Sequence, residues 1–313
     1  MTLNQLDYAL TLWRIGSFSK ASERLGITQP ALSSQIKKLE EEIGIKLFNR
    51  NTSPIEITRD GQRFLERSQQ ILTDARRLIN FSQELSQQYN DVIRLGVIPT
   101  LAPFLVPLFS DDLQKDYPEF RLDIHELTTE NVVAGVRDGS LDVGLISTPI
   151  SVAGIVFEPL FYEKFFLYMS FQPETKTHFD LQDISYDELW LLNEGNCFRD
   201  QINNFCDLNK IRQHKHFIYR SNSIDALIRI VDTKGGMTIL PELSMLSLDE
   251  EQEERVIPIG GKPKAREISL IMTKHYDKQR FIDKLGEYIR KNIPRHMLSP
   301  QDYEIVDPQI NIG

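Results

Sequence analysis

Residues 18–36 read FSKASERLGITQPALSSQI, and this stretch decides the fold of the N-terminal part of the chain. Ala21 and Leu25 stand at helical spacing and predict a helix over residues 18–25. Residues 26–28 form a glycine-containing turn, after which Thr28 is a typical N-cap and Pro30 lies in the first turn of the next helix. Together with the apolar periodicity of residues 3–13, this order predicts a helix-turn-helix.

The helix that follows the turn is expected to run from residue 29 to about residue 42. Its inward positions are predicted to be Ala31, Leu32, Ile36 and Leu39. Residues 47–50 and 55–58 resemble two short strands around a turn, which indicates a wing. The residues expected to read base edges are Gln29, Pro30, Ser33 and Gln35, and those expected to contact phosphates are Ser34, Lys37, Lys38 and Arg50. The alternative is a small helical domain with a solvated polar face.

A long helix is predicted from residue 59 to about residue 89. Apolar or small residues recur in steps of four and three, which is a heptad seam. The seam consists of Phe64, Ser68, Ile71, Ala75, Leu78, Ser82, Leu85 and Tyr89. A helix this long needs a partner, so the pattern favours a homodimer whose recognition helices address the two half-sites of an inverted repeat in double-stranded DNA. Packing of the helix on its own domain is the alternative.

The rest of the chain alternates between strand-like and helical runs, which predicts α/β domains with central, mostly parallel sheets. The expected strands are residues 92–98, 121–126, 142–146, 165–170, 189–192, 216–219, 237–240 and 267–272, and a last helix is expected over residues 279–291. Such sheets bind ligands beyond the carboxyl ends of their strands. Residues 99–100 and 127–129 follow two of the strands and are therefore candidate site residues.

The distribution of charge along the chain limits how the protein can contact DNA. The 313 residues carry a net charge of −9, but residues 1–90 hold 12 Lys and Arg against 10 Asp and Glu, so the acidity lies in the remainder. DNA contact is therefore expected to be confined to a small patch. We expect neither a membrane helix nor a signal peptide, and we expect a cytoplasmic protein. Two cysteines in such a protein indicate redox chemistry, a metal site or no special role.

Several motifs resemble the signature of LysR-type transcription regulators. They are residues 18–25, 28–33 and 36–40, followed by Gly44-x-x-Leu47-Phe48-x-Arg50 and Thr58-x-x-Gly61. The resemblance implies an all-α winged helix-turn-helix domain (1–58), a long linker and dimerisation helix (59–90) and an α/β effector domain of the type 2 periplasmic-binding-protein type (91–313). Two subdomains are expected within the last of these, subdomain I at about 91–161 plus 265–295 and subdomain II at about 162–264.

Within that family, residues 195–201 and 205–206 resemble the redox segment of the peroxide-sensing OxyR group. The resemblance implies that Cys197 and Cys206 are the redox-active pair. It further implies that the peroxide-binding and thiolate-activating residues are Thr100, Thr129, Asn196, Arg199, Asp200 and Arg266. The group usually has histidine where this chain has Asn196, and asparagine carries no proton at neutral pH.

In the hypothesis that follows, Cys197 reacts with hydrogen peroxide through a thiolate of lowered pKa and forms a sulfenic acid, which Cys206 converts to a disulfide. The sequence indicates a helix beginning near Cys197. Nine helical residues rise about 13.5 Å, whereas a disulfide needs Cα atoms about 5.5–6 Å apart. Oxidation is therefore expected to unwind this segment and so to switch the protein.

The family resemblance also implies RNA polymerase, a cellular thiol reductant and a homotetramer as partners of an oxidative-stress activator, with no cofactor and no metal. Two alternatives stay open. One is a LysR-type regulator of a small organic effector with incidental cysteines, and the other is a thiol peroxidase that turns over peroxide. Two cysteines are too few for a zinc site without further ligands. We predict a regulator and not an enzyme.

Overall fold

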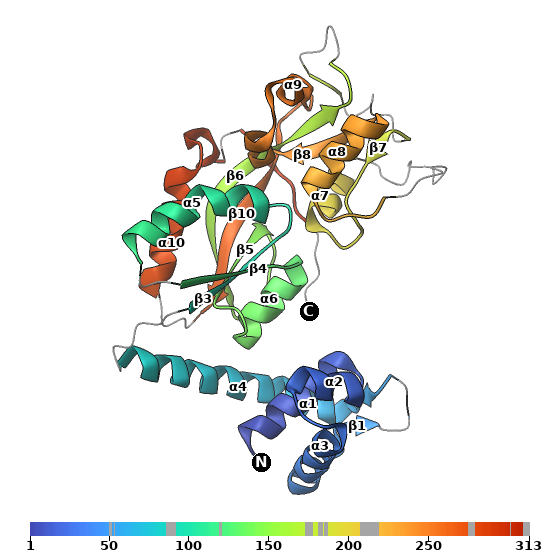
Figure 1. Cartoon of the computed structure of the whole chain (residues 1–313), viewed down its shortest axis with the longest axis vertical. Coiled ribbons are helices and arrows are strands. Elements are labelled where there is room, and N and C mark those ends of the chain that lie inside the picture. The colour runs from blue at the N-terminus through green and yellow to red at the C-terminus, as the bar shows by residue number, and fades with distance from the viewer. Residues whose placement is uncertain are drawn as a thin grey trace. The chain divides into compact units, whose positions relative to one another are not determined.

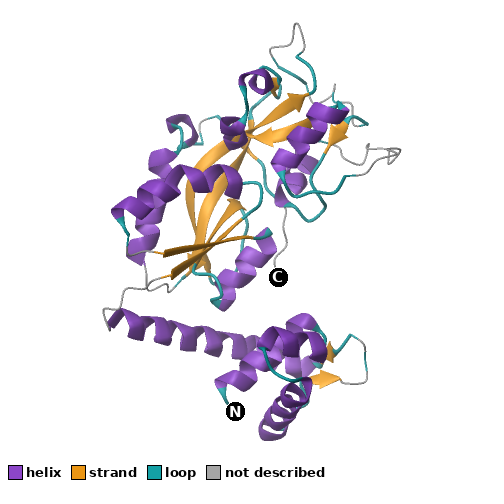
Figure 2. Cartoon of the chain, in the orientation of Figure 1, coloured by secondary structure: helices purple, strands orange, loops and turns teal. Residues whose placement is uncertain are grey.

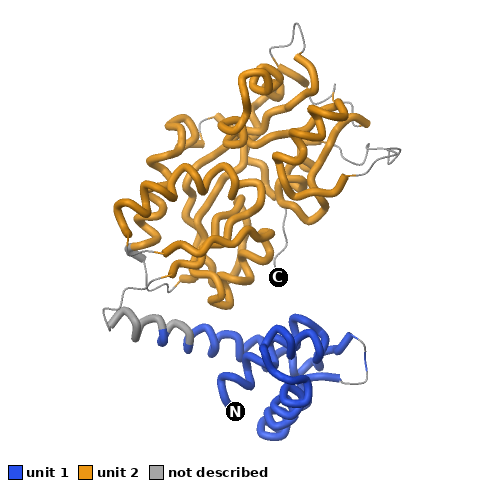
Figure 3. Tube along the Cα trace, viewed as in Figure 1, with its two compact units in different colours: residues 1–88 blue, residues 89–313 orange. Residues whose placement is uncertain are grey.

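A computed structural model gives the fold of residues 1–49, 52, 54–85, 92–118, 121–172, 178–180, 184, 187–206, 219–274, 279–300 and 302–308. Within these ranges the side chains at 76, 77, 80–85, 279 and 280 are not described. The chain forms two compact units, residues 1–88 and residues 89–313 (Figure 3). The first unit is almost entirely helical, and the second is an α/β unit (Figure 2).

Three short helices open the first unit: α1 (Leu3–Ile15), α2 (Phe18–Leu25) and α3 (Gln29–Ile43). The predicted N-cap is confirmed, because the Thr28 side chain accepts a hydrogen bond from the backbone of Ala31 at the start of α3. Gly26 ends α2 with φ of 66°, a left-handed conformation that a side chain disfavours. The short turn therefore sets α2 and α3 as a helix-turn-helix.

The core of this unit gathers around α3. Leu32, Ile36 and Leu39 are fully buried, as predicted, together with residues of α1. The prediction that Ala31 packs inward is wrong, since Ala31 lies exposed in the first turn of α3. Its neighbours Gln29 and Pro30 are exposed as well, so burial in α3 begins at Leu32.

Strands β1 (Phe48–Asn49) and β2 (Glu56–Ile57) pair antiparallel and form the wing. Helix α4 (Arg59–Leu85) follows, and Thr58 caps it by accepting from the Gly61 backbone at 2.9 Å. Gly61 is required there, because an added Cβ would lie 2.4 Å from the Leu47 carbonyl oxygen. Arg50, which was predicted at the wing, and residues 86–90, at the predicted end of the long helix, lie outside the described residues.

The second unit is built on one mixed sheet of strand order β4-β3-β5-β10-β6-β8-β7 (Figure 1). In addition, β11 pairs with β10 and β9 pairs with β6. The bounds of these strands are β3 (Val92–Val97), β4 (Arg121–Glu126), β5 (Val143–Thr148), β6 (Ile155–Met169), β7 (Leu189–Trp190), β8 (Met237–Pro241), β9 (Val256–Pro258), β10 (Lys264–Thr273) and β11 (Glu304–Ile305). The strand expected over residues 216–219 falls mainly outside the described residues.

The expectation of mostly parallel sheets is wrong for the centre of this sheet. Strands β3, β4 and β5 are mutually parallel, but β10 runs antiparallel to both β5 and β6. The long β6 pairs with β10 over its first ten residues and with β8 over its last five. It therefore joins the two ends of the unit, which Figure 1 shows on either side of it.

Six α-helices belong to the described part of this unit. They are α5 (Ala102–Asp116), α6 (Thr129–Asp138), α7 (Cys197–Phe205), α8 (Ile224–Lys234), α9 (Glu250–Glu253) and α10 (Gln279–Asn292). Because β3 and β4 are neighbouring parallel strands, Thr100 and Thr129, which follow them, lie at the same edge. The fold thus brings two of the predicted site residues to one end of the sheet.

No helix in the described ranges is both long and apolar enough to cross a membrane.

Candidate functional site

Helix α7 carries the predicted redox segment between its two cysteines. Asn196 is its N-cap, and the Asn196 side-chain oxygen accepts a hydrogen bond of 3.0 Å from the Phe198 backbone. Phe198 and Phe205 pack against Phe165 of β6, each with ring centroids 5.2 Å apart. A cap at one end and an apolar face along the helix therefore hold α7 in place. The prediction of a helix that begins near Cys197 is confirmed.

Both cysteines are free thiols and both are buried. Cys197 is the first residue of α7, and Cys206 follows its last residue, with its backbone N–H donated to the Ile202 carbonyl at 2.8 Å. A rise of about 13.5 Å over nine helical residues separates their Cα atoms. This spacing is more than twice what a disulfide spans, so the structure is that of the reduced protein.

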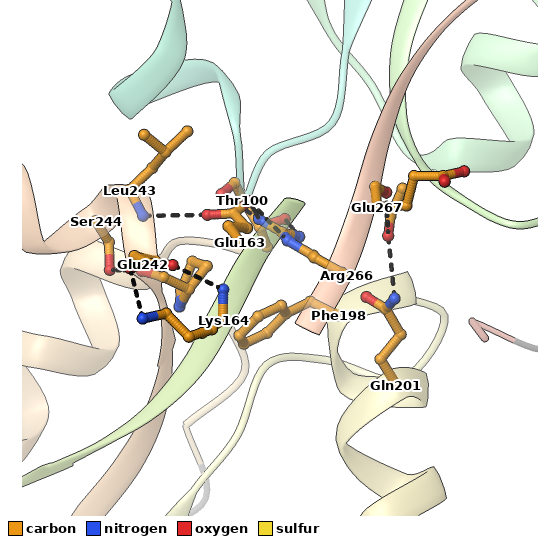
Figure 4. Close-up of polar contacts among 12 residues, drawn as sticks. Thr100, Glu163, Lys164, Phe198, Gln201, Glu242, Leu243, Ser244, Arg266 and Glu267 are labelled. Carbon is orange, nitrogen blue, oxygen red and sulfur yellow. Dashed lines mark hydrogen bonds and ion pairs between the residues drawn. The ribbon is translucent and has the colours of Figure 1, made fainter. Parts of the chain in front are cut away.

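Arg266 of β10 is the hub of the polar contacts beside α7 (Figure 4). It is fully buried, and its Nε donates to Glu163 Oε1 at 2.8 Å. Its Nη1 donates to the Thr100 hydroxyl at 2.8 Å, and its Nη2 donates to the Thr100 carbonyl at 3.2 Å. The guanidinium carbon lies 4.9 Å from the centre of the Phe198 ring. Arg266 thereby connects β6, the loop after β3 and helix α7.

The environment of Cys197 combines burial with two favourable neighbours. Burial raises the pKa of the Cys197 thiol, while the Thr129 hydroxyl and the Arg266 charge lower it and the carboxylates of Asp200 and Glu130 raise it. Burial alone raises the pKa of Cys206 to about 12. The expected lowering of the Cys197 pKa is therefore wrong for the reduced state, because desolvation outweighs the two stabilising groups.

Thr129 contributes a buried hydroxyl group to this environment. This hydroxyl is buried, lies within hydrogen-bonding reach of the Cys197 thiol, and makes no hydrogen bond to a nitrogen or oxygen atom of the described residues. A buried hydroxyl without such a partner is unusual in a folded protein. A small polar molecule beside Cys197 could satisfy it.

The other two predicted residues, Arg199 and Asp200, lie on the first turn of α7. Arg199 donates to the Leu192 carbonyl at 2.9 Å and lies 3.5 Å from the Glu194 carboxylate. Asp200 is half-buried, and burial, followed by the charge of Glu130, raises its pKa. The structure therefore places Thr129 and Arg266 near the thiol, Thr100 on Arg266, Asn196 at the helix cap and Arg199 away from the thiol.

Two buried residues of this region were not predicted. Glu163 pairs with Arg266 and also accepts from the Leu243 backbone at 3.1 Å. Gln201 donates through Nε2 to the Ser147 hydroxyl at 3.0 Å and to the Val306 carbonyl at 2.7 Å. Glu163 could have been predicted as a buried functional residue, because it is the one carboxylate in the apolar run of residues 160–169. No feature of the neighbouring sequence indicates such a role for Gln201.

The candidate DNA interface is the exposed face of α3. Gln29, Pro30, Ser34, Lys37 and Lys38 are exposed there. Ser33 and Gln35 are half-buried, and the Gln35 side-chain oxygen accepts from Gln5 of α1 at 3.1 Å. Lys37 also lies 3.6 Å from Glu41. The face presents amides, hydroxyls and two cations, the groups that contact base edges and phosphates.

Across the described part of the chain, no group of three or more His, Cys, Asp or Glu side chains is arranged to hold a metal ion.

Two family models match the chain. Residues 3–62 match the model described as "Bacterial regulatory helix-turn-helix protein, lysR family", and residues 86–293 match the "LysR substrate binding domain".

Curated relatives include the "Hydrogen peroxide-inducible genes activator" of Haemophilus influenzae, which is 26% identical over 87% of this chain and 90% of its own length. The "HTH-type transcriptional regulator EstR" of Acinetobacter baylyi is 29% identical over 78% of this chain and 81% of its own length. Among solved structures, a full-length OxyR variant from Pseudomonas aeruginosa matches with a TM-score of 0.69 and 29% identity over 93% of this chain and 95% of that one. The regulators that this chain resembles thus include peroxide-responsive ones and one named otherwise.

Proposed function

Because the chain belongs to the LysR family of bacterial regulatory helix-turn-helix proteins, we propose that it is a transcription activator that senses hydrogen peroxide through reversible formation of a Cys197–Cys206 disulfide. The observation that carries this proposal is the placement of Cys197. It is buried beside the Thr129 hydroxyl and within the field of Arg266, and a second free thiol ends the same helix.

The chemistry needs two steps. Cys197 Sγ attacks one oxygen of hydrogen peroxide, the O–O bond breaks, and the other oxygen leaves as water with the thiol proton, giving a sulfenic acid. The Cys206 sulfur then attacks the Cys197 sulfur, the S–S bond forms as the S–O bond of the sulfenic acid breaks, and the hydroxyl leaves as a second water with the Cys206 thiol proton. Peroxide gains two electrons and the two thiols lose them. A cellular thiol reductant restores both thiols by exchange.

The residues around Cys197 have defined roles in this proposal. The Thr129 hydroxyl binds the peroxide or the developing thiolate, and Arg266 stabilises the negative charge. Thr100 holds Arg266 in place through both its hydroxyl and its carbonyl. Asn196 starts α7, and Arg199 and Asp200 lie on its first turn. The remodelling follows from geometry, since the disulfide requires the helix to lose most of its length between the cysteines.

The response reaches DNA through the first unit. We propose that α3 reads the two halves of an inverted repeat in double-stranded DNA, with RNA polymerase as the partner at the promoter. Dimerisation is assigned to α4, where Ile71, Leu78 and Ile79 are 47%, 68% and 56% exposed. Leu65 and Leu72 of the same helix are buried in the core of the first unit. Ser68 of the predicted seam is buried as well, so Ile71 and Leu78 are the exposed members of that seam among the described side chains. Pairing of such dimers gives the proposed homotetramer, acting in the cytoplasm.

A DNA footprint tests the functional proposal. The reduced full-length protein is used to select fragments from sheared genomic DNA, and the selected fragments are footprinted before and after peroxide. We expect the spacing of the protected half-sites to change after peroxide in the wild type and to stay unchanged in Cys197→Ser. Identical footprints in both states of the wild type would contradict the proposal.

A LysR-type regulator of a small organic effector is the second candidate. The raised pKa of Cys197 and the similarity to the Acinetobacter regulator support it. In that case the Cys197→Ser variant keeps its full response to the effector. A third function, thiol peroxidase activity, predicts sustained peroxide consumption with a reductant, whereas a sensor is oxidised once per signal.

A further inference from the structure

The C-terminal tail folds back onto the sheet next to Arg266. Strand β11 (Glu304–Ile305) pairs in parallel with the beginning of β10, and Ile305 lies opposite Ala265, the residue before Arg266. The Val306 N–H donates to the Ala265 carbonyl at 2.8 Å, and the Glu304 N–H donates to the Pro263 carbonyl at 2.9 Å. Val306 and Pro308 are buried. Residues 304–308 are therefore packed into the second unit.

The same tail residues are also held by α7. Gln201 is fully buried and donates to the Val306 carbonyl at 2.7 Å, and Asn204 donates to the Asp307 carbonyl. Cys197, Gln201 and Asn204 stand at positions i, i+4 and i+7, so they lie on one face of the helix. The face that carries the reactive cysteine is therefore the face that holds the tail.

We propose that the tail, residues 304–308, is a latch that the helical form of α7 holds closed and that disulfide formation releases. This proposal rests on the function proposed above. Both side-chain donors lie between the two cysteines, in the segment that must unwind to bring the sulfur atoms together. Once α7 unwinds, Gln201 and Asn204 move away from the Val306 and Asp307 carbonyls. The two-residue strand β11 is then left with its β10 pairing alone, which is marginal for so short a strand.

The latch gives the oxidised state a specific local consequence. Release of β11 uncovers the backbone of β10 at residues 264 and 265, directly beside buried Arg266. It also leaves the Gln201 amide without its Val306 partner, so one hydrogen bond that stabilises the helical form of α7 is lost. The tail therefore favours the helical, reduced form, and its loss favours the oxidised form.

Hydrogen exchange tests the latch on the full-length protein. Exchange is measured over residues 298–308 in the reduced protein and after oxidation by peroxide or by diamide, an azo oxidant that takes two electrons and two protons directly from a thiol pair. Intact mass records the disulfide in each sample. We expect the tail to exchange at least about tenfold faster in the disulfide form and to stay protected in peroxide-treated Cys206→Ser.

A matched pair of variants tests the contact without oxidation. Asn204→Ala removes a donor to the tail, whereas Asn203→Ala removes an exposed amide from the same helix turn. We expect faster tail exchange in reduced Asn204→Ala and Gln201→Leu and wild-type exchange in Asn203→Ala. Because Asn204 is exposed, this variant keeps the test informative if Gln201→Leu fails to fold.

The outcomes separate the two proposals. A disulfide with a tail that stays protected overturns the latch and leaves peroxide sensing intact. A disulfide formed by diamide but not by peroxide, with tail release, supports the latch and overturns peroxide sensing. Failure of both oxidants to form the disulfide overturns both proposals.

Discussion

Arg266 Nη1 donates to the Thr100 hydroxyl at 2.8 Å, which ties the central strand of the sheet to the loop that follows β3. The same guanidinium pairs with Glu163 and lies against the Phe198 ring on α7. One buried cation therefore fixes the relative positions of three elements around Cys197. The predictions below follow from this arrangement.

Removal of the Arg266 charge is expected to destabilise the protein by about 3–5 kcal/mol, because the Glu163 carboxylate is left buried without its partner. Arg266→Met in the full-length chain measures this by denaturant unfolding. The matched control is Arg290→Met, which breaks a partly exposed pair with Glu158 and is expected to cost about 1 kcal/mol or less. The double variant Arg266→Met/Glu163→Leu is expected to recover much of the loss, and equal losses in Arg266→Met and Arg290→Met would refute the argument.

The buried thiols make stability depend on pH in the alkaline range. The pKa of Cys206 in the folded protein is raised by burial from the ordinary thiol value of 9.0 to about 12, so the unfolded state releases its proton first as pH rises. This contribution to stability is complete below pH 9 and is lost between pH 9 and about 12. We expect the free energy of unfolding to fall in that window, by at most about 1.4 kcal/mol per pH unit for one thiol. Cys206→Ala is expected to reduce this slope, and an unchanged slope contradicts the assignment.

Thr129→Val keeps the shape of the side chain and removes the hydroxyl beside Cys197. Since that hydroxyl lowers the pKa of Cys197, its loss is expected to slow the reaction of Cys197 with peroxide about tenfold, the rate equivalent of one hydrogen bond of ~1.4 kcal/mol. Stopped-flow measurement of thiol loss gives the rate constant. Thr73→Val, on α4, is the control and is expected to leave the rate unchanged. A wild-type rate in Thr129→Val shows that the hydroxyl has no part in the reaction.

Asn196 caps α7, so Asn196→Ala is expected to weaken the helix by about 1 kcal/mol. Because oxidation requires unwinding, disulfide formation from the sulfenic acid is expected to become faster. Asn196→Ser retains a capping oxygen and is expected to behave as the wild type. Rapid-quench mass spectrometry follows the disulfide step, and identical rates in the two variants would mean that helix stability does not limit it.

The exposed apolar side of α4 is expected to hold the dimer together. Leu78→Glu places a charge on that side and is expected to yield monomers at micromolar concentration in sedimentation velocity. Gln70→Glu, an exposed position on the same helix, is the control and is expected to stay assembled. If Leu78→Glu assembles as the wild type does, the seam does not form the interface.

Local features of the fold were predictable because each depends on neighbours in the sequence. Thr28, Pro30 and Gly26 mark the helix-turn-helix, and Thr58 marks the start of α4. The cap by Asn196 belongs to the same class of signal, since asparagine before a helix is a common N-cap, and sequence reasoning overlooked it.

Other features depend on contacts across long stretches of chain. Glu163 and Arg266 are 103 residues apart, and Gln201 and Val306 are 105 residues apart. The antiparallel course of β10 between β5 and β6 is likewise set by pairing partners and not by periodicity, which is the same for parallel and antiparallel strands. The raised pKa of Cys197 could not be predicted from the sequence, because it results from burial of the thiol. The charged residues next to Cys197 in the sequence did not indicate that burial.

The most direct test of the central claim is the chemistry of the two thiols in the purified full-length protein. A small excess of hydrogen peroxide is added, and free thiols and intact mass are followed for the wild type, Cys197→Ser and Cys206→Ser. The account predicts rapid loss of both thiols in the wild type with a mass decrease of about two hydrogen atoms, and no such decrease in either variant. Survival of both wild-type thiols would contradict peroxide sensing and leave a LysR-family regulator with a different effector.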